Sequence, residues 1–187
     1  MNHTGTVTIE TERLRLRKFA YADISDMIQN WIASSAVQKE YGEPAYQTTD
    51  EVHALVSEWI NRYGERDFYR WAITLKENND NIGQIAFCRV YTEIETAEIE
   101  YCIGENFWGN GYATEALRSV IDFAFTSPQF YKVEAFHREA NPRSGRVLEK
   151  TAMKKVANVR RFEIEKIGPR EDICYAVIRD EYQHIAS

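Results

Sequence analysis

Two glycines, Gly109 and Gly111, immediately precede a segment whose apolar residues have helical spacing. They lie within the stretch EIEYCIGENFWGNGYATEAL, residues 98–117. Residues 97–103 are typical of a strand, and a helix is expected to begin near Gly111. A helix start presents free backbone N–H groups and the positive end of the helix dipole, and both favour anions. Because Gly109 and Gly111 carry no side chain, the backbone can close around such an anion, and a pyrophosphate suits this geometry. A G-x-G pair before a helix is equally typical of a plain tight turn.

Other phosphate-binding motifs are excluded at this loop. No Gly-Lys-Ser/Thr follows, so the loop is not a Walker sequence, and Thr114 stands where a dinucleotide fingerprint needs glycine. The strand before the loop carries two carboxylates, Glu98 and Glu100. Residues two apart on an unbroken strand share one face, so this pair is a candidate for acid–base chemistry. A solvated acidic face is the alternative.

Cysteine and histidine usage argues against metal and redox chemistry. The three cysteines, Cys88, Cys102 and Cys174, are widely spaced and lie in apolar runs without any Cys-x-x-Cys. We interpret them as small buried side chains in a reducing compartment. The four histidines, His3, His53, His137 and His184, lack the spacing of metal ligands, so no metal site is expected.

Composition places the chain among globular domains. It has 187 residues with 44% hydrophobic residues and a net charge of −6, so a general DNA-binding role is not expected. No apolar run is long enough for a membrane span and no signal peptide is apparent, which predicts a cytoplasmic protein. Residues 132–170 hold 11 Lys/Arg and 5 Asp/Glu, a local balance of +6. That region is either a solvated face or a positive field for a multiply charged anion.

The periodicity of the chain predicts a mixed α/β domain over residues 11–187, after an N-terminal tail of residues 1–10. Thr48 and Glu51 have capping-box spacing, and Asn141-Pro142 resembles an N-cap followed by proline at the first helical position. The expected helices cover residues 24–32, a segment from 48 to about 63, a segment from about 111 to 126, and residues 142–151. The expected strands are residues 14–19, 69–75, 82–91, 97–103, 131–136, 154–162 and 172–178.

The loop sequence resembles a known family. WGNGYATEAL, residues 108–117, is similar to the acetyl-CoA-binding motif of the Gcn5-related N-acetyltransferases (GNAT), with Trp108-x-x-Gly111-x-Ala113 in place of Gln/Arg-x-x-Gly-x-Gly/Ala. The sequence of this motif is similar to that of the ribosomal-protein N-terminal acetyltransferase branch. TERLRLR at residues 11–17 and Asn141-x-x-Ser144 followed by VLEK at 147–150 also match that branch, so the resemblance covers most of the chain.

The resemblance implies a GNAT fold of α+β type. This is a mixed, mostly antiparallel sheet of six or seven strands with about four helices, whose splayed central strands hold acetyl-CoA. It also implies that strand 98–103 bulges and that its backbone N–H groups polarise the thioester carbonyl. The implied cofactor-binding residues are Cys102, Ile103, Trp108, Gly109, Asn110, Gly111, Tyr112, Ala113, Thr114, Asn141, Ser144 and Lys150.

The activity implied is direct transfer of an acetyl group to an amine, which must be neutral to attack. We expect Glu100 to act as the base or as a carboxylate that orients the amine, with Glu98 as the second candidate. Ser144 is the candidate acid for the departing thiolate, or only a hydrogen-bond partner of the sulfur, since no Tyr lies between Asn141 and Thr151. An acyl-Cys102 intermediate is the less favoured route.

The expected partners are acetyl-CoA and an amine acceptor, and the chain is expected to be a monomer or homodimer. The acceptor is predicted to be a protein N-terminal α-amino group. A small amine such as a polyamine, an aminoglycoside or an amino acid is the alternative. A CoA-binding module without activity, and an RNA-associated protein that uses the basic region, are competing hypotheses.

Overall fold

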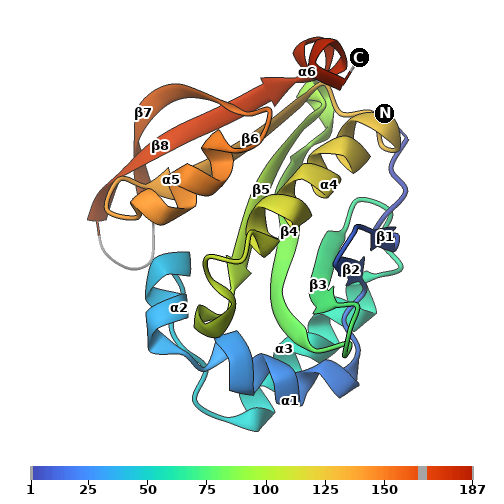
Figure 1. Cartoon of the computed structure of the whole chain (residues 1–187), viewed down its shortest axis with the longest axis vertical. Coiled ribbons are helices and arrows are strands. Elements are labelled where there is room, and N and C mark those ends of the chain that lie inside the picture. The colour runs from blue at the N-terminus through green and yellow to red at the C-terminus, as the bar shows by residue number, and fades with distance from the viewer. Residues whose placement is uncertain (1, 164–167, 187) are drawn as a thin grey trace.

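The computed structural model describes residues 2–163 and 168–186, and its centre is one mixed sheet of eight strands (Figure 1). The strand order is β1-β2-β3-β4-β5-β6-β8-β7. Every neighbouring pair is antiparallel except β5 and β6, which are parallel. The strands are β1 Ile9–Glu10, β2 Leu14–Arg17, β3 Tyr69–Leu75, β4 Asn81–Tyr91, β5 Thr96–Ile103, β6 Lys132–Arg138, β7 Lys154–Glu163 and β8 Gly168–Ile178.

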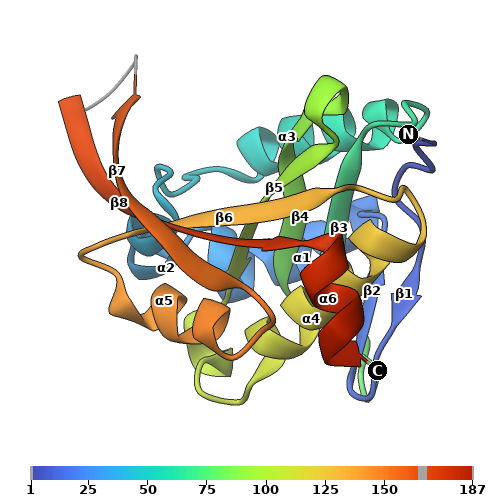
Figure 2. The same cartoon turned by 90° about the horizontal axis from the view of Figure 1, so that it is seen from above.

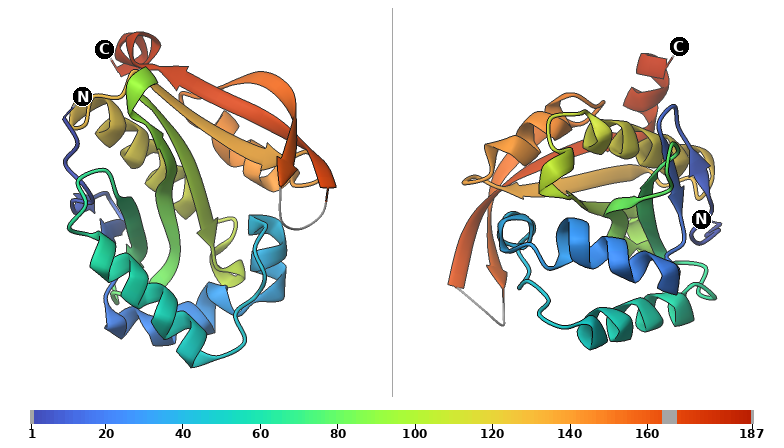
Figure 3. Two further views of the ribbon diagram at one scale, coloured as in Figure 1. Left: turned by 180° about the vertical axis from the view of Figure 1, so that it is seen from behind. Right: turned by 60° about the horizontal axis from the view of Figure 1, so that its bottom comes forward.

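Helices cover both faces of the sheet. The α-helices are α1 Ile24–Met27, α2 Ser35–Tyr41, α3 Thr49–Arg62, α4 Tyr112–Thr126, α5 Pro142–Glu149 and α6 Arg179–Ala186. A π-helical turn, η2 Ile28–Ile32, continues α1, and short 3-10 turns are η1 Tyr21–Asp23, η3 Thr92–Ile94 and η4 Glu105–Phe107. In the right-hand view of Figure 3, α1 and α3 (blue to teal) lie on one side of the strands and α4 and α5 (yellow to orange) on the other. Viewed from above, α6 lies beside α4, on the same side (Figure 2).

Each face of the sheet has its own apolar core. The first lies under α4 and α5 and includes Leu117, Val120 and Leu148. The second lies under α1 and α3 and includes Met27 and Trp59. The apolar stripes of these helices match the buried positions, and burial of such side chains is the main stabilising contribution to the fold.

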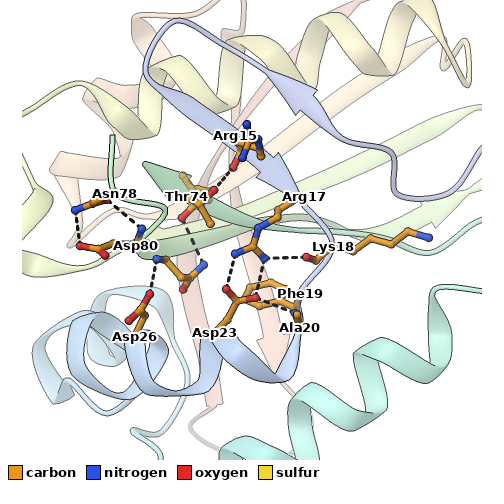
Figure 4. Close-up of polar contacts among 12 residues, drawn as sticks. Arg15, Arg17, Lys18, Phe19, Ala20, Asp23, Asp26, Thr74, Asn78 and Asp80 are labelled. Carbon is orange, nitrogen blue, oxygen red and sulfur yellow. Dashed lines mark hydrogen bonds and ion pairs between the residues drawn. The ribbon is translucent and has the colours of Figure 1, made fainter. Parts of the chain in front are cut away.

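The first helical layer is fixed to the sheet by a partly buried ion pair. The Arg17 guanidinium donates two hydrogen bonds to Asp23, Nη1 to Oδ2 at 2.8 Å and Nη2 to Oδ1 at 2.6 Å (Figure 4). Asp23 also accepts from the Ala20 backbone N–H at 2.8 Å. This bidentate geometry joins the end of β2 to the start of α1.

The structure confirms the predicted mixed sheet and most of its elements. The capping box of α3 is present, with the Thr48 side chain accepting from the Glu51 N–H and the Glu51 carboxylate accepting from the Thr48 N–H. The sheet has eight strands rather than six or seven, because Ile9–Glu10 pair with β2. Helices α2 and α6 were not predicted from the sequence. No helix of the described residues is long and apolar enough to cross a membrane.

Candidate active site

Strands β5 and β6 pair over only part of their length. Their paired residues run from Thr96 with Lys132 to Ile99 with Ala135. In contrast, β5 stays paired with β4 as far as Ile103. The two strands therefore diverge after Ile99, as Figure 1 shows. The predicted splay is thus present.

The predicted bulge is not in β5. The register shift lies in β4, where Cys88 is the extra residue between the Phe87–Ile99 and Arg89–Glu98 pairs. The expectation of a bulge in strand 98–103 was wrong. A bulge in the neighbouring strand bends the sheet at the same place, because the two strands are paired there.

A cavity of about 200 Å³ opens where β5 and β6 diverge. Residues 98–103 of β5 line it together with residues of α2, β6, the loop before α4, and α5. The predicted site residues that line it are Glu98, Glu100, Cys102, Ile103, Trp108, Ala113, Asn141 and Ser144. Successive β5 side chains point to opposite faces, so this one cavity is in contact with both helical layers.

The two predicted carboxylates are both paired with arginines. Glu98 is buried, and its Oε2 lies 3.0 Å from Arg89 Nη1. Glu100 is more accessible, with its side chain 28% exposed, and its Oε1 accepts from Arg70 Nη2 at 2.8 Å. Of the two, Glu100 is therefore the carboxylate that an acceptor in the cavity reaches more easily.

A polar cluster surrounds Glu100, and two of its members, Arg70 and Gln84, were not assigned from the sequence. Arg70 donates to both Glu100 and Gln84, and the Gln84 side-chain amide donates to the Tyr41 hydroxyl at 3.0 Å. Burial, and then the Glu100 charge, raise the pKa of Tyr41 well above its ordinary value, so its hydroxyl stays protonated. The signal available in the sequence was Arg70 within the otherwise apolar run YRWAITL.

Ser144 lies on the other side of the cavity, at the start of α5. Asn141 caps this helix, as predicted, by accepting the Ser144 N–H at 3.2 Å. The Ser144 Oγ lies 2.9 Å from the Tyr101 hydroxyl, and either of these two groups can donate to the other. The Ser144 carbonyl, at 3.2 Å, is a second acceptor for the Tyr101 hydrogen. Burial raises the pKa of Tyr101, so this hydroxyl remains a donor. No role was predicted for Tyr101 from the sequence.

The glycine loop ends in a helix start that suits an anion. Gly111 is the residue before α4 and has φ of +82°, a left-handed conformation that strongly favours glycine. The first intrahelical bond runs from the Glu115 N–H to the Gly111 carbonyl, so the N–H groups before Glu115 have no helical acceptor. The Arg143 guanidinium lies 3.9 Å from the Trp108 ring centroid, which places a cation above the same loop. These donors and this charge fit a pyrophosphate.

Three other predicted cofactor residues, Gly111, Thr114 and Lys150, line a second hollow beside the start of α4, together with Arg118. Gly109, Asn110 and Tyr112 belong to the loop and helix start between the two hollows. The Lys150 carbonyl accepts from Arg118 Nε at 3.0 Å. The predicted cofactor residues thus lie in the first cavity, in the second hollow, and in the loop and helix start at residues 109–112.

The buried cysteine in the cavity is not an activated nucleophile. Burial, followed by the Glu100 charge, raises the pKa of Cys102 to about 12, so the thiol stays protonated near neutral pH. Only the thiolate form attacks carbonyl carbon efficiently. The acyl-Cys102 route therefore gains no support.

Comparisons with known proteins agree with this geometry. Residues 13–154 match the family model described as an acetyltransferase (GNAT) domain. The chain belongs to the GNAT family. An uncharacterised N-acetyltransferase, p20 of Bacillus licheniformis, is 29% identical over 94% of this chain and 98% of its own length. This GNAT chain is an acetyltransferase, and its cosubstrate is acetyl-CoA.

Solved GNAT structures share its fold. A putative ribosomal-protein-serine acetyltransferase from Vibrio cholerae has a TM-score of 0.80 at 18% identity, covering 94% of this chain and 99% of that one. Spermidine N-acetyltransferase from Vibrio cholerae, in complex with CoA and spermine, has a TM-score of 0.77 at 16% identity, covering 92% and 99%. The predicted GNAT fold is confirmed.

Proposed function

We propose that this acetyltransferase transfers acetyl directly to a primary amine, and that the acceptor is the N-terminal α-amino group of a protein. Direct transfer is supported by one observation: a single cavity is lined by Glu100 on one side and by the Tyr101–Ser144 pair on the other. An amine and a thioester that meet in this cavity would have a carboxylate and a hydroxyl pair at opposite sides.

The cofactor would be held at the glycine loop and the start of α4. Backbone N–H groups from Trp108 to Ala113 would bind the pyrophosphate, and Asn141 would contact the pantetheine arm. Arg143 and Lys150 would add positive charge beside the phosphates. When bound, acetyl-CoA supplies an acetyl group activated as a thioester, and backbone N–H groups near Cys102 and Ile103 would polarise its carbonyl.

On the acceptor side, Glu100 would bind and orient the amine and accept its proton, directly or through water. An amine is protonated at neutral pH, so a carboxylate in the cavity attracts it and then assists its deprotonation. Glu98 is the second candidate, although its ion pair with Arg89 and its burial leave it less accessible.

On the opposite side, Ser144 would donate a hydrogen bond or a proton to the departing sulfur. A serine hydroxyl is a poor acid by itself. When the Tyr101 hydroxyl donates to Ser144 Oγ, the serine hydrogen would be directed into the cavity. Each residue of this pair therefore has a distinct role, with Ser144 facing the sulfur and Tyr101 orienting Ser144.

A protein N-terminus is favoured by the ribosomal-protein branch that the motifs resemble and by the fold shared with a putative ribosomal-protein-serine acetyltransferase. The second candidate is a polyamine. It is supported by three carboxylates that line the same cavity, Glu40, Glu98 and Glu100, and by the fold shared with a spermidine acetyltransferase.

The test is free-thiol release from acetyl-CoA with three acceptors: a peptide with a free N-terminus, the same peptide blocked at its N-terminus, and spermine. We expect turnover with the free peptide and none with the blocked one. Glu100→Gln should lower kcat/KM for the peptide about 100-fold, because the base is lost. Turnover with spermine alone would replace the protein acceptor by the polyamine.

A further inference from the structure

The TERLRLR motif at residues 11–17 has no role in the chemistry described so far. Its first three residues lead into β2, and the structure places them against the first turn of α4, about 100 positions later in the sequence. Thr11 Oγ1 donates to Glu115 Oε1 at 2.6 Å, and the Arg13 backbone N–H donates to the same oxygen at 2.8 Å. Arg13 Nε donates to the other oxygen, Oε2, at 2.8 Å.

Both oxygens of Glu115 are therefore occupied by this motif. Arg13 Nη2 lies 2.7 Å from Glu115 Oε2, and the Glu115 side chain is only 17% exposed. Burial alone raises the pKa of Glu115, but the hydrogen bonds from Thr11 and Arg13 outweigh it and hold the pKa below its ordinary value. The carboxylate is thus ionised and fixed in one orientation.

Arg13 also reaches the glycine loop itself. Its Nη1 donates to the Asn110 carbonyl at 2.9 Å, and its guanidinium lies 4.6 Å from the Tyr112 ring centroid. Asn110 and Tyr112 flank Gly111, the residue in the left-handed conformation. One arginine therefore links a carboxylate, a loop carbonyl and a ring, which an ammonium group on a lysine stem cannot reproduce.

We propose that Arg13 and Glu115 are positioning residues that preorganise the 108–113 loop for the CoA pyrophosphate. This inference rests on the cofactor placement proposed above. A loop already fixed in its binding conformation loses less conformational entropy on binding, and affinity rises accordingly. The Asn110 carbonyl is bound by a cation instead of being left beside an anion.

Substitution of Glu115 distinguishes a positioning role for this residue from a purely electrostatic effect on CoA binding. Glu115 is a negative charge in the first turn of the helix that would bind an anion. If charge alone mattered, Glu115→Gln would tighten CoA binding, because it removes this repulsion and frees Arg13. If the contacts position the loop, the same substitution weakens binding.

The test compares Glu115→Gln, Arg13→Lys and the wild type, with Arg15→Gln as the control. Arg15 lies two residues after Arg13, in β2, and forms an exposed ion pair with Glu10, so Arg15→Gln breaks an ion pair of the same motif outside the loop. Two quantities are measured: the Kd for CoA by calorimetry, and kcat/KM with acetyl-CoA and with S-acetylpantetheine, which lacks the pyrophosphate and the adenosine.

We expect both loop variants to bind CoA about tenfold more weakly while kcat/KM with S-acetylpantetheine stays within about twofold of the wild type. Arg15→Gln should match the wild type in both measurements. A purely structural role would lower activity with both substrates in parallel, and that outcome would overturn the proposal. So would unchanged or tighter CoA binding by Glu115→Gln. If the wild type used S-acetylpantetheine as well as acetyl-CoA, the proposed cofactor placement would itself fail.

Discussion

Among single residues, the hydroxyl pair of Tyr101 and Ser144 gives the sharpest prediction. The Tyr101 hydroxyl lies 2.9 Å from Ser144 Oγ, and when it donates to that oxygen the serine hydrogen is left for the sulfur. Tyr101→Phe should lower kcat about tenfold and leave the KM for acetyl-CoA within about twofold, because only the leaving-group step loses a hydrogen bond. Steady-state kinetics on purified variants measure both quantities.

A double substitution tests whether the two residues act together. If Tyr101 acts only through Ser144, Tyr101→Phe should add little to the effect of Ser144→Ala. Tyr131→Phe is the matched control, because Tyr131 is 41% exposed and does not line the cavity. Fully additive effects of the two substitutions would contradict the coupling.

The predictability of a site residue depends on how local its partners are. Asn141 and Ser144 were assigned from a short motif, and the structure shows that cap in place. Tyr101 was not assigned, because its partner Ser144 lies 43 positions away and meets it only when α5 packs against the sheet. The same holds for Arg70, which reaches Glu100 across β4.

Among the secondary-structure elements, the position of β5 depends on its close contact with Gly83 of β4. A Cβ at Gly83 of β4 would lie 2.2 Å from the Cys102 carbonyl oxygen, so only glycine fits there. Gly83→Ala should push β5 away from β4 and lower stability by about 1–3 kcal/mol. The KM for acetyl-CoA should rise as well, because Cys102 and Ile103 line the cavity.

The control for this substitution is Gly64→Ala, since a Cβ at Gly64 meets nothing within 4 Å. Chemical denaturation gives the stability change and thiol release gives the KM. Equal behaviour of the two alanine variants would show that the β4–β5 approach does not constrain the cavity.

Elements with strong internal patterns were predicted closely. The expected strand at 69–75 matches β3, and the capping box at Thr48 marks the start of α3. In contrast, α2 has only seven residues and two buried ones, too few for a clear stripe. Its ends did carry signals, because Ser34 caps it and Gly42 closes it with φ of +99°. The two-residue strand β1 exists only through its pairing with β2.

Over the whole molecule, charge is unevenly distributed along the chain. Residues 132–170, which include β6, α5 and β7, carry +6, and the rest of the chain therefore carries −12. Figure 1 shows β6, β8 and β7 diverging from β1–β5. Residues of both β5 and β6 line the cavity. Arg138 and Arg143 of the positive segment line the cavity and would attract an anionic cosubstrate. Glu98 and Glu100 line the same cavity and would attract a cationic amine.

This distribution predicts a salt-dependent association with CoA. The association rate, followed by the fluorescence of Trp108 and the other tryptophans, should fall about tenfold between roughly 0.05 M and 0.5 M salt, because ions screen the attraction. Lys155→Glu, an exposed change on β7, should slow association about threefold at low salt. Arg66→Glu reverses a charge at an exposed position after α3 and should have little effect. A similar slowing by both reversals would mean that net charge, and not its separation across the sheet, governs how CoA reaches the cavity.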